Sequence, residues 1–149
     1  MIDRKGRNRL ALALRRYAIG RITSDELEEI ETDWRDRGVR AVHQMSWGLY
    51  SDGQGYAVGQ HALNWAVRRD LARWILFLRS EQEYLWPEYR FDAGWLSLFG
   101  KKRLLKIGGM EARWNKRLQQ FLEAGDGEVW PFINRAAYDE ALVRRGSQV

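Results

Sequence analysis

Apolar side chains recur at helical spacing near the start of the chain. Leu10, Leu14 and Tyr17 lie on one face of a helix predicted from about residue 7 to 19. Gly20 follows directly, at a position where glycine commonly ends a helix. The first element is therefore expected to be a helix with one buried face.

The next residues contain a clear signal for the start of a second helix. Thr23 and Glu26 have the T-x-x-E spacing of a capping box, and Ile22 and Leu27 are placed to close a hydrophobic staple around it. This helix is expected to end at Gly38. Because the turn between the two helices is short, they are expected to lie antiparallel.

Two further helices are predicted in the middle of the chain. The first covers about residues 39–50, and a glycine-rich loop, 51–59, follows it. The second starts near Asn64, a good N-cap residue, and becomes apolar around most of its circumference by Leu78. A helix that is apolar on most sides is expected to lie centrally in the fold.

The last third is less regular. Residues 84–92 and 128–132 are rich in aromatic residues and each contains a proline, so they are expected to form at most a short two-stranded extended pair. A fifth helix is expected to end at Gly125. Asn134 is expected to cap a final helix whose apolar face consists of Ala137, Tyr138, Ala141 and Leu142. The tail from 146 is expected to fray.

Together these elements predict a mainly all-α fold. A chain of 149 residues fits a single helical domain, 1–149, with an N-terminal helical hairpin at about 7–37. The expected architecture is a compact bundle of about five to six helices. Eight Trp, six Tyr and five Phe can supply its core, since each buried aromatic removes about 150–250 Å² from water. Packing thus accounts for the aromatics without a ligand.

The chain has no cysteine, which excludes disulfides, thiolate nucleophiles and cysteine-containing zinc sites. The basic N-terminal segment lacks the continuous apolar run of a signal peptide, and 74–78 is far shorter than the roughly 20 residues that span a bilayer. We therefore expect a cytoplasmic protein.

Charge is arranged in blocks along the chain. Residues 1–24 carry a net charge of +6, residues 25–33 carry −6, and residues 101–117 carry +6 again. Blocks of opposite sign that adjoin one another are expected to attract and neutralise each other as neighbouring helices.

Motifs for chemistry are weak. Gly53, Gly55 and Gly59 miss the Gly-x-Gly-x-x-Gly spacing of nucleotide loops, so a plain loop is expected there. His43 is interpreted as an interhelical hydrogen-bonding residue, and His61 as a loop or helix-start residue. No metal site and no cofactor are expected.

Catalysis would depend on the acids near the aromatic residues. Glu88 and Asp92 are the pair whose neighbours could desolvate a carboxyl group, which general acid catalysis requires, and His61 could join them. Solvated surface acids are the competing interpretation. Enzyme activity is left open, with no residue assigned as catalytic.

Six residues are the predicted binding residues. They are Trp86, Tyr89, Trp95, Lys101, Lys102 and Arg103. Exposed aromatic residues of this kind are typical anchors in protein interfaces. Basic residues beside them could instead contact nucleic-acid phosphates or an anionic membrane surface, or simply offset the dipole at a helix end.

Two resemblances rest on short motifs. Residues 10–34, with Leu-Ala-Leu-Ala-Leu before Gly20 and Ile22-Thr23 before the acidic run, resemble the helical hairpin called SHOCT. That family tends to accompany larger domains and is thought to mediate association. A wider set of motifs, including 20–23, 47–52 and 129–132, resembles an uncharacterised family of small bacterial proteins, which carries over no site.

The expected function is therefore non-catalytic binding. A protein partner or a second copy of the chain is the leading expectation, as for an adaptor, a regulator or an immunity-like inhibitor. The alternatives are nucleic-acid binding through segments 1–21 and 101–117, and an enzyme with a carboxylate site at Glu88 and Asp92. A membrane surface is the least favoured partner.

Overall fold

The computed structural model of this chain describes residues 1–31, 35–47, 65–88 and 110–147, leaving aside the side chains of 110–115. This described part contains six α-helices, one 3₁₀-helix and no strand. The elements are α1 (Arg4–Ala18), α2 (Ser24–Glu28), α3 (Arg37–Ser46), α4 (Trp65–Arg79), α6 (Met110–Glu123), η2 (Gly127–Val129) and α7 (Arg135–Gly146). The prediction of a mainly helical fold with five to six helices is confirmed.

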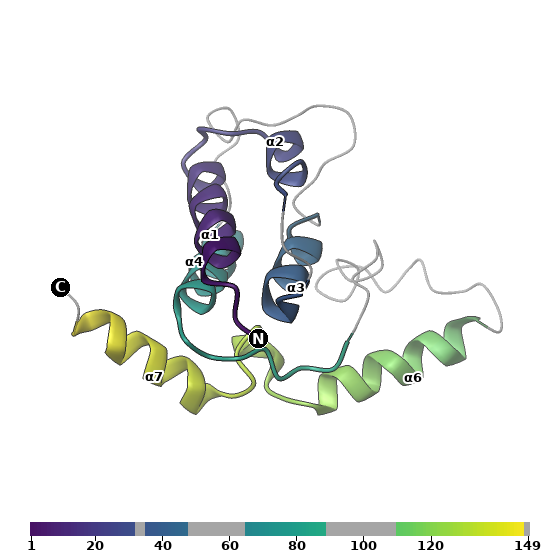
Figure 1. The fold of residues 1–149 in the computed structure, drawn as a ribbon. Coiled ribbons are helices and arrows are strands. Elements are labelled where there is room, and N and C mark those ends of the chain that lie inside the picture. The colour runs from purple at the N-terminus through teal and green to yellow at the C-terminus, as the bar shows by residue number, and fades with distance from the viewer. Residues whose placement is uncertain (32–34, 48–64, 89–109, 148–149) are drawn as a thin grey trace.

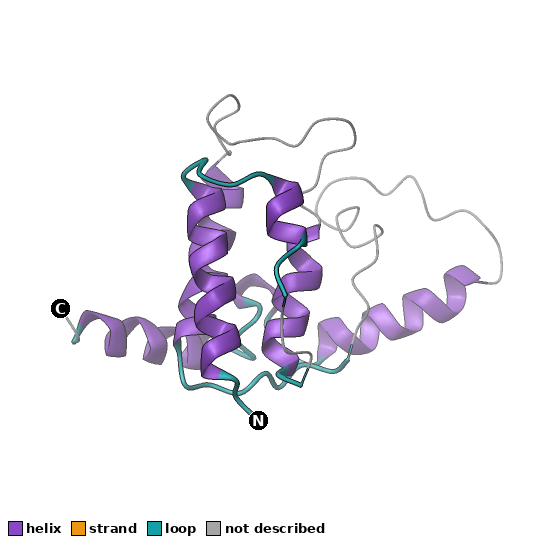
Figure 2. Cartoon of the chain, turned by 45° about the horizontal axis from the view of Figure 1, so that its top comes forward, coloured by secondary structure: helices purple, strands orange, loops and turns teal. Residues whose placement is uncertain are grey.

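The helices form a body and two arms (Figure 1). α1 packs chiefly against α4, and α2 and α3 follow one another along the other side of α1. α6 and α7 leave the base of this body in opposite directions, and a second view shows the same arrangement (Figure 2). The central position predicted for the fourth helix is confirmed, since α4 contacts α1, α3 and α7.

α1 forms where its apolar periodicity predicts it. Leu10, Leu14 and Tyr17 are buried, and Gly20 follows with a φ of 73°, the left-handed conformation that glycine adopts at low cost. Guanidinium groups near its N-terminus bind backbone carbonyls at the C-terminus of α4, because Arg4 donates to Leu78 O at 3.1 Å. The two helices therefore run antiparallel.

The capping box of α2 is confirmed in both directions. Thr23 N donates to the Glu26 carboxylate at 2.7 Å, and Glu26 N donates to Thr23 Oγ1 at 3.2 Å. The predicted extension to Gly38 is wrong, because α2 ends at Glu28. Glu28 and Glu29 lie at the C-terminal end of the helix, where the dipole disfavours negative charge.

Gly38 lies inside α3 and does not end a helix. Asp36 is the N-cap of α3, and its carboxylate accepts hydrogen bonds from Gly38 N at 2.8 Å and Val39 N at 3.3 Å. A Cβ at Gly38 would lie 2.8 Å from the Phe77 ring of α4. Glycine is therefore needed here for the close approach of α3 to α4.

The predicted extended pair is not formed by the described residues of the two segments. Asp126 caps a 3₁₀-helix over 127–129, so this stretch forms no strand within the described residues. The two segments still lie together through side chains, since Trp86 Nε1 donates to Phe132 O at 3.1 Å. The prolines and the 3₁₀ turn replace a backbone ladder with aromatic packing.

The arms are built from the predicted fifth and last helices. α6 ends at Glu123, just before Gly125. Asn134 caps α7 as expected, because its side chain accepts a hydrogen bond from Ala137 N at 2.9 Å. α7 ends at Gly146, the residue from which the tail was expected to fray, and that expectation stays a prediction. No described helix has the length and apolar character to cross a membrane.

Candidate binding surfaces

Trp86 was expected to be an exposed anchor, and the structure corrects this. The side chain is fully buried, and its ring stacks on Phe121 with centroids 4.7 Å apart. Its indole N–H is satisfied by the carbonyl of Phe132. A large aromatic side chain with a satisfied polar atom gains more from burial in the core than from exposure. In this conformation Trp86 cannot contact a partner.

Other aromatic residues extend this cluster between the body and the arms. Phe77 of α4 packs edge-on to Tyr84 and to Phe132, with centroids 6.2 and 5.3 Å apart. Trp130 Nε1 donates to the hydroxyl of Tyr84 at 3.2 Å. Burial, the largest effect, raises the pKa of the Tyr84 hydroxyl well above its ordinary value. The expectation that packing accounts for aromatics is confirmed for these residues.

Glu88 does not supply the desolvated carboxyl group that the enzyme hypothesis requires. Its side chain is 70% exposed and pairs with Arg40 and, at 4.0 Å, with Arg37. An exposed acid between two arginines is a surface ion pair. Its intended partners Asp92 and His61 lie outside the described residues.

His43 lies at the contact between α2 and α3. It is buried in α3 close to the backbone of Glu28 and Leu27 at the end of α2, and the hydrogen-bonding role predicted for it stays a prediction. Burial is the largest effect and lowers the pKa of His43, so the ring is neutral at pH 7. Within the described chain, His, Asp and Glu residues form no group of three or more that could hold a metal ion.

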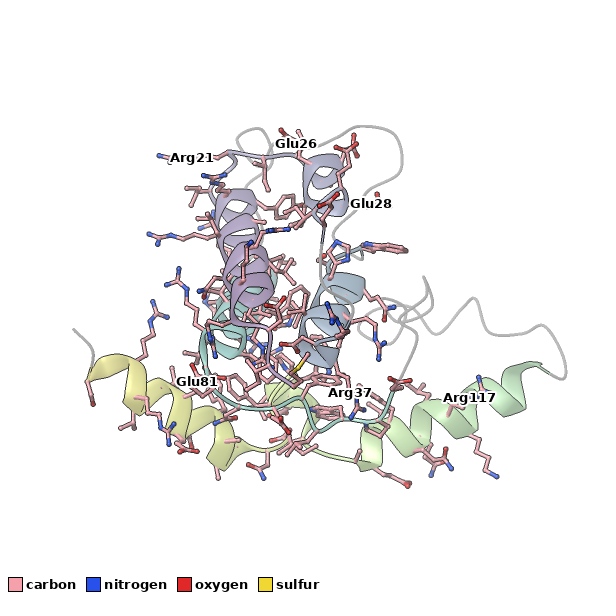
Figure 3. All side chains as sticks on the ribbon, viewed as in Figure 1. Arg21, Glu26, Glu28, Arg37, Glu81 and Arg117 are labelled. Atoms are coloured by element: carbon pink, nitrogen blue, oxygen red, sulfur yellow. The ribbon has the colours of Figure 1, made fainter. Side chains whose placement is uncertain are left out.

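The remaining predicted binding residues fall where the structure gives no description. They are Tyr89, Trp95, Lys101, Lys102 and Arg103. Of the basic segment 101–117, Lys116 and Arg117 are described, and both are exposed on α6. The side chain of Arg117 is labelled on this arm in Figure 3.

Among the described residues no ion pair joins the first two charge blocks, although Arg9 of the first donates to the backbone carbonyl of Glu31 in the second at 3.0 Å. Arg7 pairs with Asp36 at 2.7 Å and Arg4 with Glu81 at 2.6 Å, and both acids lie outside the block 25–33. Arg21 projects to one side of the molecule, away from the labelled acids at the top of α2 (Figure 3). A basic surface is therefore left along α1.

α1 has a continuous exposed side opposite its buried one. The exposed residues of this helix and its C-cap are Lys5, Asn8, Arg9, Leu12, Arg15, Arg16 and Ile19. At about 100° per residue they fall within one arc of about 120°. This arc contains four basic residues and no acid, so it can attract an anionic partner.

α7 has an exposed apolar surface that the sequence analysis did not anticipate. Leu142 was expected to face the core, yet it is 43% exposed, and Val143 beside it is 69% exposed. Ala141 is buried instead. At about 100° per residue Leu142 lies at the edge of the predicted apolar face, and Val143 lies outside it. That geometry is the signal that could have identified this surface.

Comparison with family models, with curated proteins and with solved structures finds no match to this chain. The resemblances to the SHOCT hairpin and to a family of small bacterial proteins therefore remain predictions. Any functional proposal depends on the two surfaces just described.

Proposed function

We propose that this chain is a non-catalytic binding domain of the bacterial cytoplasm that associates with a second copy of itself through α7. The observation that carries the proposal is the exposure of Leu142 and Val143 side by side on a helix that projects from the body (Figure 1).

α7 has few contacts with the rest of the chain. Gln82 Nε2 donates to Ala137 O at 2.7 Å, and the ring of Tyr138 packs edge-on to Phe132 at 5.4 Å. Ala141 is the one residue of this helix that is buried in the described structure. Helices of this length are marginal in water on their own, so further packing on the exposed side stabilises α7.

A second copy fits this helix under two-fold symmetry. An axis passing between Leu142 and Val143 brings these side chains of the two antiparallel copies together, which is the self-complementary arrangement of most homodimers. The same register places Glu140 of one copy level with Arg145 of the other and Asp139 level with Gly146. In this register no like charges of the two copies lie level with one another.

Sedimentation velocity over a wide range of protein concentrations tests the proposal. The wild type is expected to shift from monomer to dimer with increasing concentration. In the double variant Leu142→Asp/Val143→Asp the dissociation constant of the dimer is expected to rise at least tenfold, about 1.4 kcal/mol or more, because charges would be buried at the contact.

Leu12→Asp is the matched control, since Leu12 is 44% exposed on a different helix. It is expected to leave the dimer unchanged. A wild type that stays monomeric at every concentration would overturn the proposal. A wild-type dimer that the α7 double variant does not weaken would remove α7 from the interface.

A further inference from the structure

The exposed side of α1 carries more positive charge than its hydrogen bonds and ion pairs within the protein require. We define the α1 basic face as Lys5, Arg9, Arg15, Arg16 and Arg21, which are all exposed. Among the residues that the structure describes, Arg15, Arg16 and Arg21 take part in no side-chain hydrogen bond or ion pair. Their charge is therefore available to a partner.

Most structural contacts of the basic residues in α1 are made by Arg4 and Arg7, while Arg9 of the basic face donates to Glu31 O at 3.0 Å. Arg7 is buried and holds Asp36, and Arg4 binds carbonyls at the end of α4. The helix dipole accounts for Arg15 and Arg16, which lie in the last turn. It does not account for Lys5, which lies in the first turn where the dipole disfavours positive charge.

An exposed arginine of α4 extends the basic face. Because α1 and α4 are antiparallel, the C-terminal half of α1 lies beside the N-terminal half of α4, where Arg68 is exposed. Figure 3 shows nitrogen-tipped side chains projecting from the side of the molecule that these two helices share. The face thus covers more than one helix.

We infer that the α1 basic face binds the phosphate backbone of a nucleic acid, which goes beyond the proposed self-association. Lys5 and Arg16 are about 16 Å apart along the helix axis, a length over which one strand of a duplex presents about five phosphates. Arginine is suited to this ligand because its planar guanidinium binds phosphate oxygens in pairs.

An anionic membrane is a weaker fit for the same face. Peripheral membrane helices bury an apolar side in the lipid. The apolar side of α1, with Leu10, Leu14 and Tyr17, is already buried against the rest of the protein. On its exposed side the apolar residues are Leu12 and Ile19, and they lie among basic residues.

Fluorescence anisotropy with a short labelled oligonucleotide, as single-stranded DNA, duplex DNA and RNA, tests the inference. The wild type is expected to bind at about 50 mM salt and to lose affinity steeply by about 200 mM. Arg15→Ala/Arg16→Ala is expected to weaken binding roughly tenfold or more. On duplex DNA the salt slope is expected to be shallower by about 2, since each phosphate contact contributes about 0.9.

Lys116→Ala/Arg117→Ala is the matched control, because it removes two adjacent exposed basic residues from α6, outside both the α1 basic face and the α7 contact. It is expected to retain most of the affinity, with sedimentation and urea unfolding confirming that both variants keep the wild-type state. The inference is overturned by a wild type that does not bind at low salt, by salt-insensitive binding, or by equal losses in both variants. Tighter, Arg15- and Arg16-dependent binding to vesicles of anionic lipid would assign the face to a membrane instead.

Discussion

At the scale of single residues, the ion pair of Arg7 and Asp36 joins three helices. Both side chains are about 1% exposed, and Arg7 also donates to Gln82 O at 2.8 Å, just beyond the end of α4. The Asp36 carboxylate caps α3 and accepts a hydrogen bond from Asp3 N at 2.9 Å. Every charge of the pair is thus hydrogen-bonded, as buried charges require.

Asp36 also links stability to pH. Burial, the largest effect, would raise the pKa of its carboxyl group, but the hydrogen bonds from Arg7, Asp3 and Val39 prevail and lower it below the ordinary value. A lowered pKa in the folded state contributes stability above the unfolded value of about 3.9. That contribution is lost as the pH falls through the folded pKa.

Asp36→Asn is therefore expected to lower the free energy of unfolding at pH 7 by about 3–5 kcal/mol, because Arg7 would keep a buried charge without its counterion. The difference from the wild type is expected to stay constant from pH 7 to about pH 5 and to narrow at lower pH. Urea unfolding followed by tryptophan fluorescence measures both values. A difference that stays constant at low pH as well would contradict the role assigned to Asp36.

At the scale of elements, local capping signals predicted helix starts better than helix ends. Thr23 and Asn134 start their helices as expected, because a cap is formed by residues within one turn of each other. The place of Gly38 inside α3 depends on the contact that α3 makes with α4. Such tertiary contacts leave no periodic signal in the sequence.

Binding surfaces were harder to predict than helices. Trp86 is aromatic and lies in an irregular segment, which is typical of an exposed anchor, yet its environment comes from Phe121 and Phe132, more than thirty residues away. The basic character of segment 1–21 was predicted from the sequence. Its lack of neutralisation was not, because Arg4 and Arg7 take their partners from 36 and 81.

The contact between α3 and α4 gives a prediction about packing. Gly38→Ala is expected to lower the free energy of unfolding by about 1–3 kcal/mol, since the new methyl group would press on the Phe77 ring in the core. Gly146→Ala is the matched control in α7, where nothing lies within 4 Å of the added carbon. Its stability is expected to stay the same or rise by up to about 1 kcal/mol. Equal effects in the two variants, measured by urea unfolding, would argue against this close contact.

At the scale of the whole molecule, the core and the candidate surfaces are separate. Aromatic residues from 84–86 and 129–132 pack between the arms and the body. They are buried, and the indole N–H groups of their tryptophans are hydrogen-bonded. The surfaces to which we assign function are the basic side of α1 and the apolar side of α7. The aromatic cluster is structural.

The absence of cysteine from the chain allows the central claim, self-association through α7, to be tested with a single thiol. In Val143→Cys the two-fold arrangement brings the thiols of two copies within reach of a disulfide, which requires Cα atoms less than about 7 Å apart. Mild oxidation followed by non-reducing electrophoresis is expected to give a covalent dimer from Val143→Cys and monomer from Leu12→Cys. Monomer from Val143→Cys, or equal cross-linking at both positions, would contradict the account.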